Sequence, residues 1–374
     1  VAAYLLTKVS TYPMFLLAAL GLGLAGGSFA VGIAYVSTWY PSEKQGTALG
    51  IFGMGNVGAA VTNFGAPILL VAMGGAWQGV AQVYSIILLI TGVLFYIVTK
   101  GDPALRRRKA EGIKHATFME QMEPLRNLQV WRFSLYYFFV FGAFVALALW
   151  LPRYYVGAYG LELGTAGMLA AAYALPGSIF RALGGYLSDI IGARRVMYWT
   201  FVVCVACTFI MSYPSTDYNI AGIQGPVEFN ITIPLWAFVS LTIVLGFFMS
   251  LGKAAVYKHI PVYYPNHVGS VGGIVGLIGG LGGFCLPIAF GYMNDVIGIW
   301  TSCFMLLTLL IGIALLWMHV SIVRMDKKSS PELRGPRYLP ELEALMKESE
   351  ELQEKTAAIR KQSEAVISQI KQET

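Results

Sequence analysis

The most informative stretch of the sequence is Gly185-Tyr-Leu-Ser-Asp189-Ile-Ile-Gly192-Ala-Arg194-Arg195. It combines glycine, a carboxylate and paired arginines in one turn directly after an apolar run. Glycine permits a tight turn and a close approach between helices. Asp189 can pair with an arginine and hold two groups of helices together. The stretch therefore predicts a gating motif at one membrane boundary, although an ordinary turn between two spans is the simpler alternative. The members of the motif are Gly185, Asp189, Gly192, Arg194 and Arg195.

Apolar runs lie on both sides of this turn. A bilayer core about 30 Å thick needs about 20 apolar residues per helix. The sequence contains nine such runs, near residues 11–39, 47–72, 79–98, 133–156, 165–187, 196–213, 233–260, 270–290 and 300–323. We therefore predict an all-α polytopic membrane protein that is surrounded by the lipid bilayer.

The composition excludes other classes of protein. Of the 374 residues, 56% are apolar and 12% are charged, against about 25% charged residues in soluble domains. The net charge of +6 comes from basic residues clustered between apolar runs, which argues against a nucleic-acid partner. Neither HExxH nor GxSxG occurs, so we predict no enzyme. Cys204 and Cys207 lack the second ligand pair that zinc needs, so we predict no metal and no other cofactor.

Lysine and arginine predict which loops face the cytoplasm. They concentrate in residues 100–132, at Arg194-Arg195 and at Lys327-Lys328, whereas residues 214–232 contain none. The C-terminus should therefore be cytoplasmic. The predicted parts are residues 1–99 (about three spans of an N-terminal half), 100–132 (a basic cytoplasmic loop between the halves), 133–325 (a six-helix C-terminal half) and 326–374 (a cytoplasmic tail).

The tail carries a seven-residue apolar repeat at Leu345, Leu352, Ile359 and Val366. This spacing predicts an amphipathic helix with one apolar stripe. The stripe either contacts the membrane domain or a cytoplasmic partner, or the helix is solvated and has no partner.

Two glycine runs repeat each other in the two halves. Tyr40-Pro41 precedes Gly46, Gly50 and Gly53, and Tyr264-Pro265 precedes Gly269, Gly273 and Gly276. Matched halves are typical of duplicated carriers. Only three runs precede the basic loop and six follow it, so we expect a twelve-helix carrier of which roughly the first three helices precede this sequence.

The glycine runs also carry a family resemblance. Gly55-Asn56-Val-Gly58-Ala-Ala-Val61 and residues 269–283 are similar to the paired nitrate-signature motifs of the nitrate/nitrite porter family. The Gly185–Arg195 turn resembles the gating loop of the major facilitator superfamily, of which that family is a branch. The resemblance extends from residue 1 to about residue 323 and implies a major facilitator fold that moves nitrate, nitrite or both.

Arg181 is the leading candidate for the anion site. It lies eight residues before Asp189, or about 12 Å along a helix, close to the membrane midplane. No carboxylate occurs in the run 165–187, and a charge at this depth normally faces a cavity or a counter-ion. A planar guanidinium suits a planar oxyanion, although an ion pair with another helix is the alternative. The resemblance implies that Arg181 is one of two substrate arginines.

Depth and resemblance add further candidates. Asn56 lies about 15 Å into its helix, and Gly279 and Gly280 lie at the matching depth of the repeat. The resemblance implies that Phe29, Tyr137 and Phe141 sandwich the anion. Plain core packing is the alternative for each aromatic ring.

Two lysines in the run 233–260 are weaker candidates. Lys258 lies near the cytoplasmic end of the run, where its side chain can simply extend to the membrane surface. Lys253 is deeper and could line the transport route.

The sequence thus predicts a nitrate:proton symporter of the inner (plasma) membrane, working by alternating access. Its partners would be nitrate or nitrite, with protons coupled. A nitrate/nitrite antiporter, a major facilitator carrier for another small anion and a membrane sensor with a carrier fold are the alternatives. No Asp or Glu is buried in the nine runs, so the residues do not separate symport from exchange.

Overall fold

The computed structural model describes residues 2–101, 117–265, 267–328, 351–353 and 355–356. Two compact units divide the chain, Val1–Leu316 and Trp317–Thr374. The predicted seven-residue repeat of the tail lies almost entirely outside the described residues.

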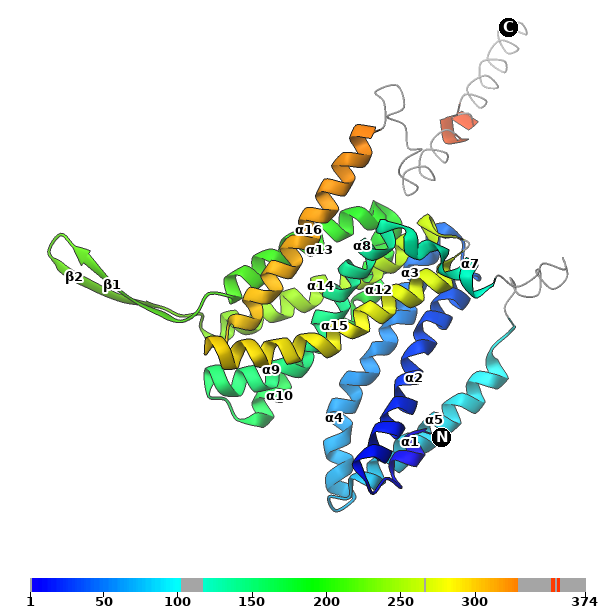
Figure 1. The fold of residues 1–374 in the computed structure, drawn as a ribbon, viewed down its shortest axis with the longest axis horizontal. Helices are drawn as coiled ribbons and strands as arrows, with labels where there is room; N and C mark the ends of the chain where they lie inside the picture. The colour runs from blue at the N-terminus through cyan, green and yellow to red at the C-terminus, as the bar shows by residue number, and fades with distance from the viewer. Residues whose placement is uncertain (1, 102–116, 266, 329–350, 354, 357–374) are drawn as a thin grey trace, which may run out of the picture. The chain divides into compact units, whose positions relative to one another are not determined.

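Helices make up the first part of the chain, with short 3-10 segments between them (Figure 1). Their bounds are α1 Ala2–Leu6, α2 Tyr12–Ser37, η1 Ser42–Lys44, α3 Gln45–Gly53, η2 Met54–Asn56, α4 Val57–Ala72 and α5 Trp77–Val98.

Helices also make up most of the second part. Their bounds are α7 Phe118–Met122, η3 Glu123–Arg126, α8 Leu128–Tyr137, η4 Phe138–Ala143, α9 Phe144–Tyr159, α10 Leu163–Ala174, α11 Pro176–Ile179, α12 Arg181–Leu187, η5 Ser188–Gly192, α13 Ala193–Met211, α14 Leu235–Tyr263, α15 Val268–Ile297 and α16 Ser302–Lys328.

Every predicted apolar run coincides with helix, so the all-α prediction is confirmed for the membrane part. Seven helical segments of the described chain are long and apolar enough to cross a membrane. Nine runs become seven segments for two reasons. The segment Leu163–Met211 joins two runs, which Gly192 separates by a turn with φ of +88°. The run 47–72 is interrupted by η2, which leaves two shorter helices.

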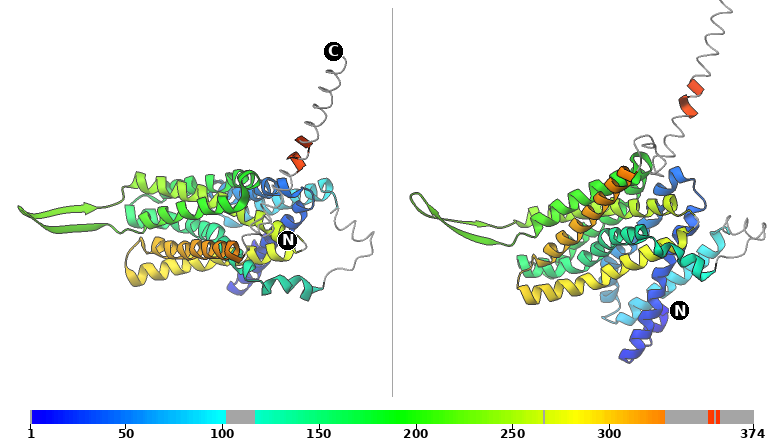
Figure 2. Two further views of the ribbon diagram at one scale, coloured as in Figure 1. Left: turned by 90° about the horizontal axis from the view of Figure 1, so that it is seen from above. Right: turned by 45° about the horizontal axis from the view of Figure 1, so that its top comes forward.

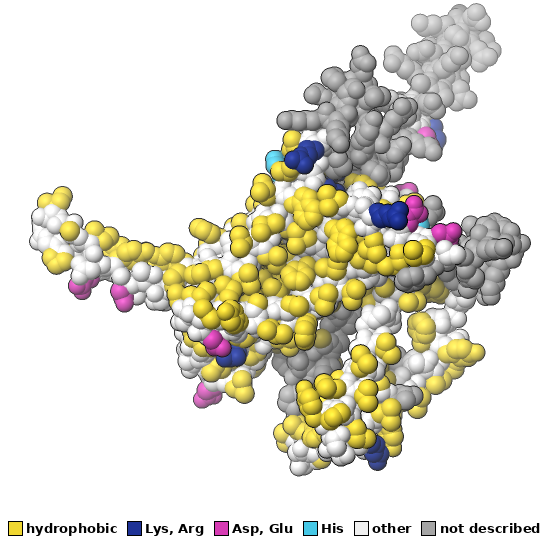
Figure 3. All heavy atoms as spheres, viewed as in Figure 1, with side chains coloured by type: hydrophobic (Ala, Val, Ile, Leu, Met, Phe, Trp, Pro, Cys, Tyr) yellow, Lys and Arg dark blue, Asp and Glu magenta, His cyan; other side chains and the backbone are white. Residues whose placement is uncertain are grey.

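The surface of the described residues matches a lipid environment. Hydrophobic side chains cover much of the face in Figure 3. Helix α5 has no buried residue, and Leu89, Phe95 and Tyr96 are among its exposed side chains. Such exposure is costly in water and expected for a helix that faces lipid.

Helix α14 lies at the centre of the C-terminal half. Every residue from Met249 to Pro261 is buried, and the helix contacts α3, α8, α10, α11, α12, α13 and α15. A helix that is apolar on all sides is expected in such a central position. Polar side chains on this stretch are therefore shielded from solvent by the surrounding helices.

An exposed β-hairpin interrupts the helices between α13 and α14 (Figures 1 and 2). Strands β1 Thr216–Gly222 and β2 Gly225–Ile231 pair antiparallel, with Tyr218 opposite Phe229. Because residues 214–232 contain no lysine or arginine, they are expected to face outward, and their sequence does not by itself predict strands. Alternating apolar residues on either side of Gly222 and Gly225 explain the hairpin.

Candidate functional site

Arg181 is completely buried at the start of α12. The helix is broken just before it, because α11 ends at Ile179 and α12 begins at Arg181. Pro176 begins α11, and proline interrupts the regular hydrogen bonding of a helix. The break therefore places the guanidinium at the junction of two helical segments, inside the protein.

The guanidinium of Arg181 is only partly satisfied. Its Nη2 donates a hydrogen bond to Tyr137 Oη at 3.3 Å. Its Nε and Nη1 are buried and have no hydrogen-bond acceptor among the described residues. A buried donor without an acceptor costs about 1–3 kcal/mol, and more when it is charged. An anion placed against Nε and Nη1 would remove that cost.

Aromatic rings surround the guanidinium. Its Cζ lies 5.0 Å from the centroid of the Phe29 ring and 5.8 Å from that of Tyr257. Tyr137 stacks on Phe141 with centroids 5.0 Å apart and ring planes 9° apart, and it meets the Tyr257 ring edge-on at 4.8 Å. We refer to Arg181, Phe29, Tyr137, Phe141 and Tyr257 as the arginine cluster.

The cluster is assembled from both halves of the chain. Phe29 comes from α2, Tyr137 and Phe141 come from α8 and η4, and Tyr257 comes from α14. Segment η4 is π-helical, and such bulges are frequent at functional sites. The part of the chain before residue 100 thus contributes Phe29 to the surroundings of the guanidinium.

Two glycines make room for these side chains. A Cβ atom at Gly53 would overlap the Arg181 guanidinium, and one at Gly279 would overlap the Tyr137 ring. Gly142 of η4 meets α15 closely, since a Cβ there would lie 2.7 Å from the Gly279 carbonyl oxygen. The glycine runs thus serve close contact with the cluster as well as contact between helices.

The structure brings most of the predicted anion-site residues together, but not all. Arg181, Phe29, Tyr137, Phe141 and Gly279 meet in or against the cluster. Gly280 is exposed, with open space where a side chain would lie.

Asn56 is half-buried at the end of η2, three residues after Gly53. Segment η2 contacts α11. The roles of Asn56 and Gly280 therefore stay predictions.

Sequence reasoning missed Tyr257 and Gly53 as members of the site. Tyr257 is completely buried, and its Oη donates to the Gly272 carbonyl oxygen at 3.2 Å. It lies four residues after Lys253, hence on the same face of α14. That spacing was the available signal, because two polar groups in one deep apolar run at helical spacing indicate a lined interior.

The gating motif forms a second cluster around Asp189. Its Oδ1 accepts a hydrogen bond from the Gly46 amide at 2.9 Å, and its Oδ2 accepts from the Thr47 amide at 2.6 Å and from Thr47 Oγ1 at 2.7 Å. These amides begin α3, where the helix dipole favours a negative charge. Asp189 therefore joins α3 of the N-terminal half to the C-terminal half.

The basic partner of Asp189 differs from the prediction. Lys258 Nζ lies 2.7 Å from Asp189 Oδ1 and also donates to the Ser42 carbonyl oxygen, so the partner is a lysine and not an arginine. Lys258 is buried and does not extend to the surface, because its ammonium is held between Ser42 of η1 and Asp189 of η5. We refer to Asp189, Lys258, Gly46 and Thr47 as the Asp189 cluster.

The other motif residues surround this contact. A Cβ atom at Gly185 would overlap the Gly46 carbonyl, so only glycine permits this crossing of α12 and α3. Gly192 has φ of +88°, which favours glycine. Arg194 Nη2 donates to Tyr263 Oη at 3.3 Å, and Arg195 is exposed.

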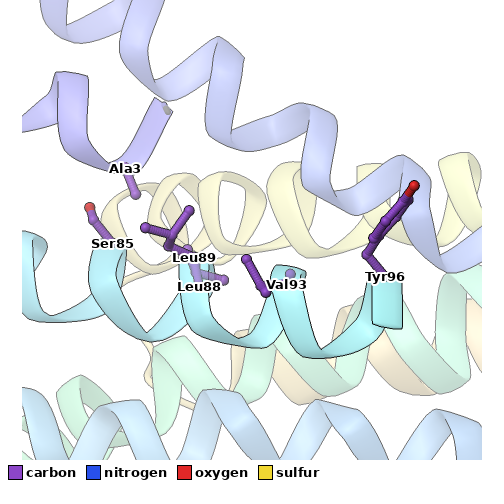
Figure 4. Close-up of a pocket in the computed structure, with 7 residues that line it drawn as sticks. Ala3, Ser85, Leu88, Leu89, Val93 and Tyr96 are labelled. Atoms are coloured by element: carbon purple, nitrogen blue, oxygen red, sulfur yellow. The ribbon is translucent and has the colours of Figure 1, made fainter. Parts of the chain in front are cut away.

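A pocket of about 390 Å³ lies elsewhere, between α1 and α5 (Figure 4). Leu88, Leu89 and Val93 line it, with Ser85 and Tyr96 as polar residues. It has no charged lining residue and includes no member of the arginine cluster. Its lining offers nothing that would select an anion.

The chain is similar in sequence to known membrane carriers. A model of the Major Facilitator Superfamily matches residues 1–231. The "Probable nitrate/nitrite antiporter NarK1" of Thermus thermophilus is 41% identical over 346 residues, covering 90% of this chain and 77% of that protein. The "Nitrite extrusion protein" of Bacillus subtilis (strain 168) is 32% identical, covering 80% of this chain and 69% of that protein.

Solved structures share the fold. A crystal structure of the E. coli fucose:proton symporter FucP superposes with a TM-score of 0.62, covering 85% of this chain and 80% of that one. Sequence identity is 16%, so this likeness concerns the fold alone.

Proposed function

The chain belongs to the nitrate/nitrite porter family of the major facilitator superfamily, and from that premise we propose that it carries nitrate and nitrite across the membrane with Arg181 as the anion-binding residue. The observation that carries the proposal is the buried Arg181 guanidinium, whose Nε and Nη1 have no acceptor among the described residues. Two oxygens of a planar oxyanion can accept from two guanidinium nitrogens at once.

The aromatic rings supply the rest of the proposed site. Their faces exclude water, and a guanidinium–anion contact is stronger in a dry, low-dielectric site than in water. Tyr137 Oη already contacts Arg181 and can donate its own proton to a bound oxygen.

The Asp189 cluster supports alternating access. It joins α3 to the C-terminal half at one end of the bundle, while the arginine cluster takes residues from both halves. Separation of the halves at Asp189 would open the arginine cluster to that end. Arg194 and Arg195 lie at the same end, so we propose that this end faces the cytoplasm. The membrane would then be the plasma membrane.

Proton symport is our proposed form of coupling. Exchange of nitrate for nitrite is the second candidate, because a relative with 41% identity is named as a probable nitrate/nitrite antiporter. Among the described residues, no carboxylate forms an ion pair with Arg181.

Uptake of labelled nitrate into proteoliposomes tests the function. We expect uptake driven by an inward proton gradient in the wild type, and a loss of at least about a hundredfold in Arg181→Ala, because two charged hydrogen bonds disappear. Arg153→Ala is the matched control, since Arg153 is an exposed arginine within another helix.

The result decides between the candidates. Uptake only against internal nitrite would favour exchange. No uptake of nitrate or nitrite by correctly inserted protein would refute the proposed substrate.

A further inference from the structure

Lys253 is a buried, ionisable side chain that the proposed anion site does not yet explain. It lies in the middle of the buried stretch of α14 and is completely inaccessible to solvent. A buried charge requires a paired charge or strong hydrogen bonds. Among the described residues, no carboxylate forms an ion pair with it.

Its contacts connect it to the segment that carries Arg181. Lys253 Nζ donates to the Gly177 carbonyl oxygen at 2.6 Å and lies 3.3 Å from the centroid of the Phe144 ring. Gly177 belongs to α11, just before the helix break that precedes Arg181. The ammonium has three N–H donors, and this single carbonyl takes one of them.

Lys253 lies one helical turn from the arginine cluster. It precedes Tyr257 by four residues on α14, and Gly177 precedes Arg181 by four residues, so each pair is separated by about 6 Å along its helix. Helices α14 and α12 both run towards the Asp189 cluster. Lys253 is therefore on the hairpin side of Arg181, one turn away.

Among the titratable and charged side chains near Lys253 in the described chain, Arg181 is the charged one. The titratable and charged side chains that surrounding elements bring to this level are Arg181 of α12, Tyr137 of α8, Tyr155 of α9, Tyr173 of α10, Cys204 of α13 and Tyr257 of α14 itself. Segments α3, α11 and η4 have no ionisable side chain, and those of α15 (Cys285, Tyr292 and Asp295) are exposed. Two cations one turn apart in a buried, low-dielectric site repel each other.

We propose that Lys253 is the proton-binding group that couples anion binding at Arg181 to proton transport. The inference rests on the proposed function. In the empty site, an ammonium at Lys253 would be a second buried positive charge beside Arg181, without a counter-ion among the described residues. A bound anion supplies that counter-ion and stabilises the ammonium.

Each transported anion therefore brings one proton. The lone pair of the Lys253 nitrogen forms an N–H bond with a proton supplied by bulk water, and the anion and the proton together carry no net charge. Linkage requires the reverse effect as well, so protonation of Lys253 must strengthen anion binding by the same factor.

The test measures nitrate binding and proton uptake together, on the purified protein in lipid nanodiscs. A pH-indicator dye in weakly buffered solution reports protons, and labelled nitrate reports binding. For the wild type we expect about one proton per bound nitrate, and an affinity that falls about tenfold per pH unit on the alkaline side.

Two substitutions at Lys253 separate coupling from folding. Lys253→Met should bind nitrate without proton uptake and with little dependence on pH. Lys253→Arg keeps a permanent charge, so it should bind nitrate tightly, again without proton uptake. Tyr173→Phe is the control, because it removes a nearby hydroxyl and should leave proton uptake on nitrate binding unchanged.

The outcomes are distinct. Three results would overturn the role of Lys253 and leave the anion-carrier function intact. They are nitrate binding without proton uptake in the wild type, unchanged proton uptake in Lys253→Met, and loss of proton uptake in Tyr173→Phe. Absence of nitrate and nitrite binding to folded wild type would overturn the proposed function itself. If neither Lys253 variant folds, Phe144→Leu takes its place, because the Phe144 ring lies against the Lys253 nitrogen. This variant must shift the pH of half-maximal proton uptake, and an unshifted pH profile contradicts the proposal.

Discussion

The two glycine runs have the same spacing but different packing. In α3, a Cβ atom at Gly46 or Gly50 would meet the C-terminal half at 2.5–2.7 Å, including the carbonyl oxygens of Gly185 and Arg181. In α15, a Cβ at Gly269 or Gly273 would meet only alanine methyl groups of α2, at 3.5–3.7 Å. Glycine is thus required at the first contact and replaceable at the second.

The N-termini of the two helices differ in the same way. The first amides of α3 are bound by the Asp189 carboxylate, whereas no side chain of the described residues caps α15 at His267. The same glycine spacing therefore makes contacts of different strength in the two helices. The α3 contact fixes α3 to the C-terminal half, whereas α2 and α15 of the described chain meet only across small side chains.

The largest expected effect is at Asp189. Asp189→Asn removes a buried charge and leaves Lys258 unpaired, and breaking a buried ion pair in this way costs about 3–5 kcal/mol. We expect transport to fall by at least about a hundredfold, because the state closed at this end is lost. Lys258→Gln should cost less, since Asp189 still holds the α3 amides.

Uptake assays and the labelling of a cysteine placed near Ser42 measure this pair. Asp295→Asn is the matched control, because Asp295 is an exposed carboxylate on α15. Equal losses in Asp189→Asn and Lys258→Gln would show that the ion pair, and not the helix terminus, fixes α3 to the C-terminal half.

The second prediction compares one alanine substitution in each of the two glycine runs. Gly50→Ala should destabilise the closed state by about 1–3 kcal/mol, because the new methyl group must displace the α12 backbone. Gly273→Ala should change stability by less than about 0.5 kcal/mol, since only a methyl group lies near. Thermal unfolding in detergent compares the two variants, and equal shifts would remove the distinction between the runs.

The third prediction concerns Tyr257, which connects the second run to the arginine cluster. Tyr257→Phe removes the hydrogen bond to the Gly272 carbonyl and should cost about 1 kcal/mol. The ring remains beside Arg181, so we expect weaker nitrate binding with uptake retained. Complete loss of uptake would place the hydroxyl itself on the transport route.

Much of the site was predictable because it depends on local properties. The apolar runs, the depth of Arg181 and the glycine spacing are all properties of single segments. The resemblance added Phe29, Tyr137 and Phe141, which the structure places around Arg181. Lys258 was misjudged, because its partner Asp189 is 69 residues away in the chain and no local pattern indicates that pairing.

The class of the protein and its apolar runs could be predicted from the sequence alone, because a bilayer requires long apolar helices wherever the chain crosses it. The sequence also predicts that a costly arginine lies deep in one of them. Only the tertiary structure decided that Tyr257 covers this arginine, that Lys253 binds the broken segment before it, and that Asp189 binds α3. These contacts join segments distant in the chain, and their energies depend on burial and orientation that no single segment specifies.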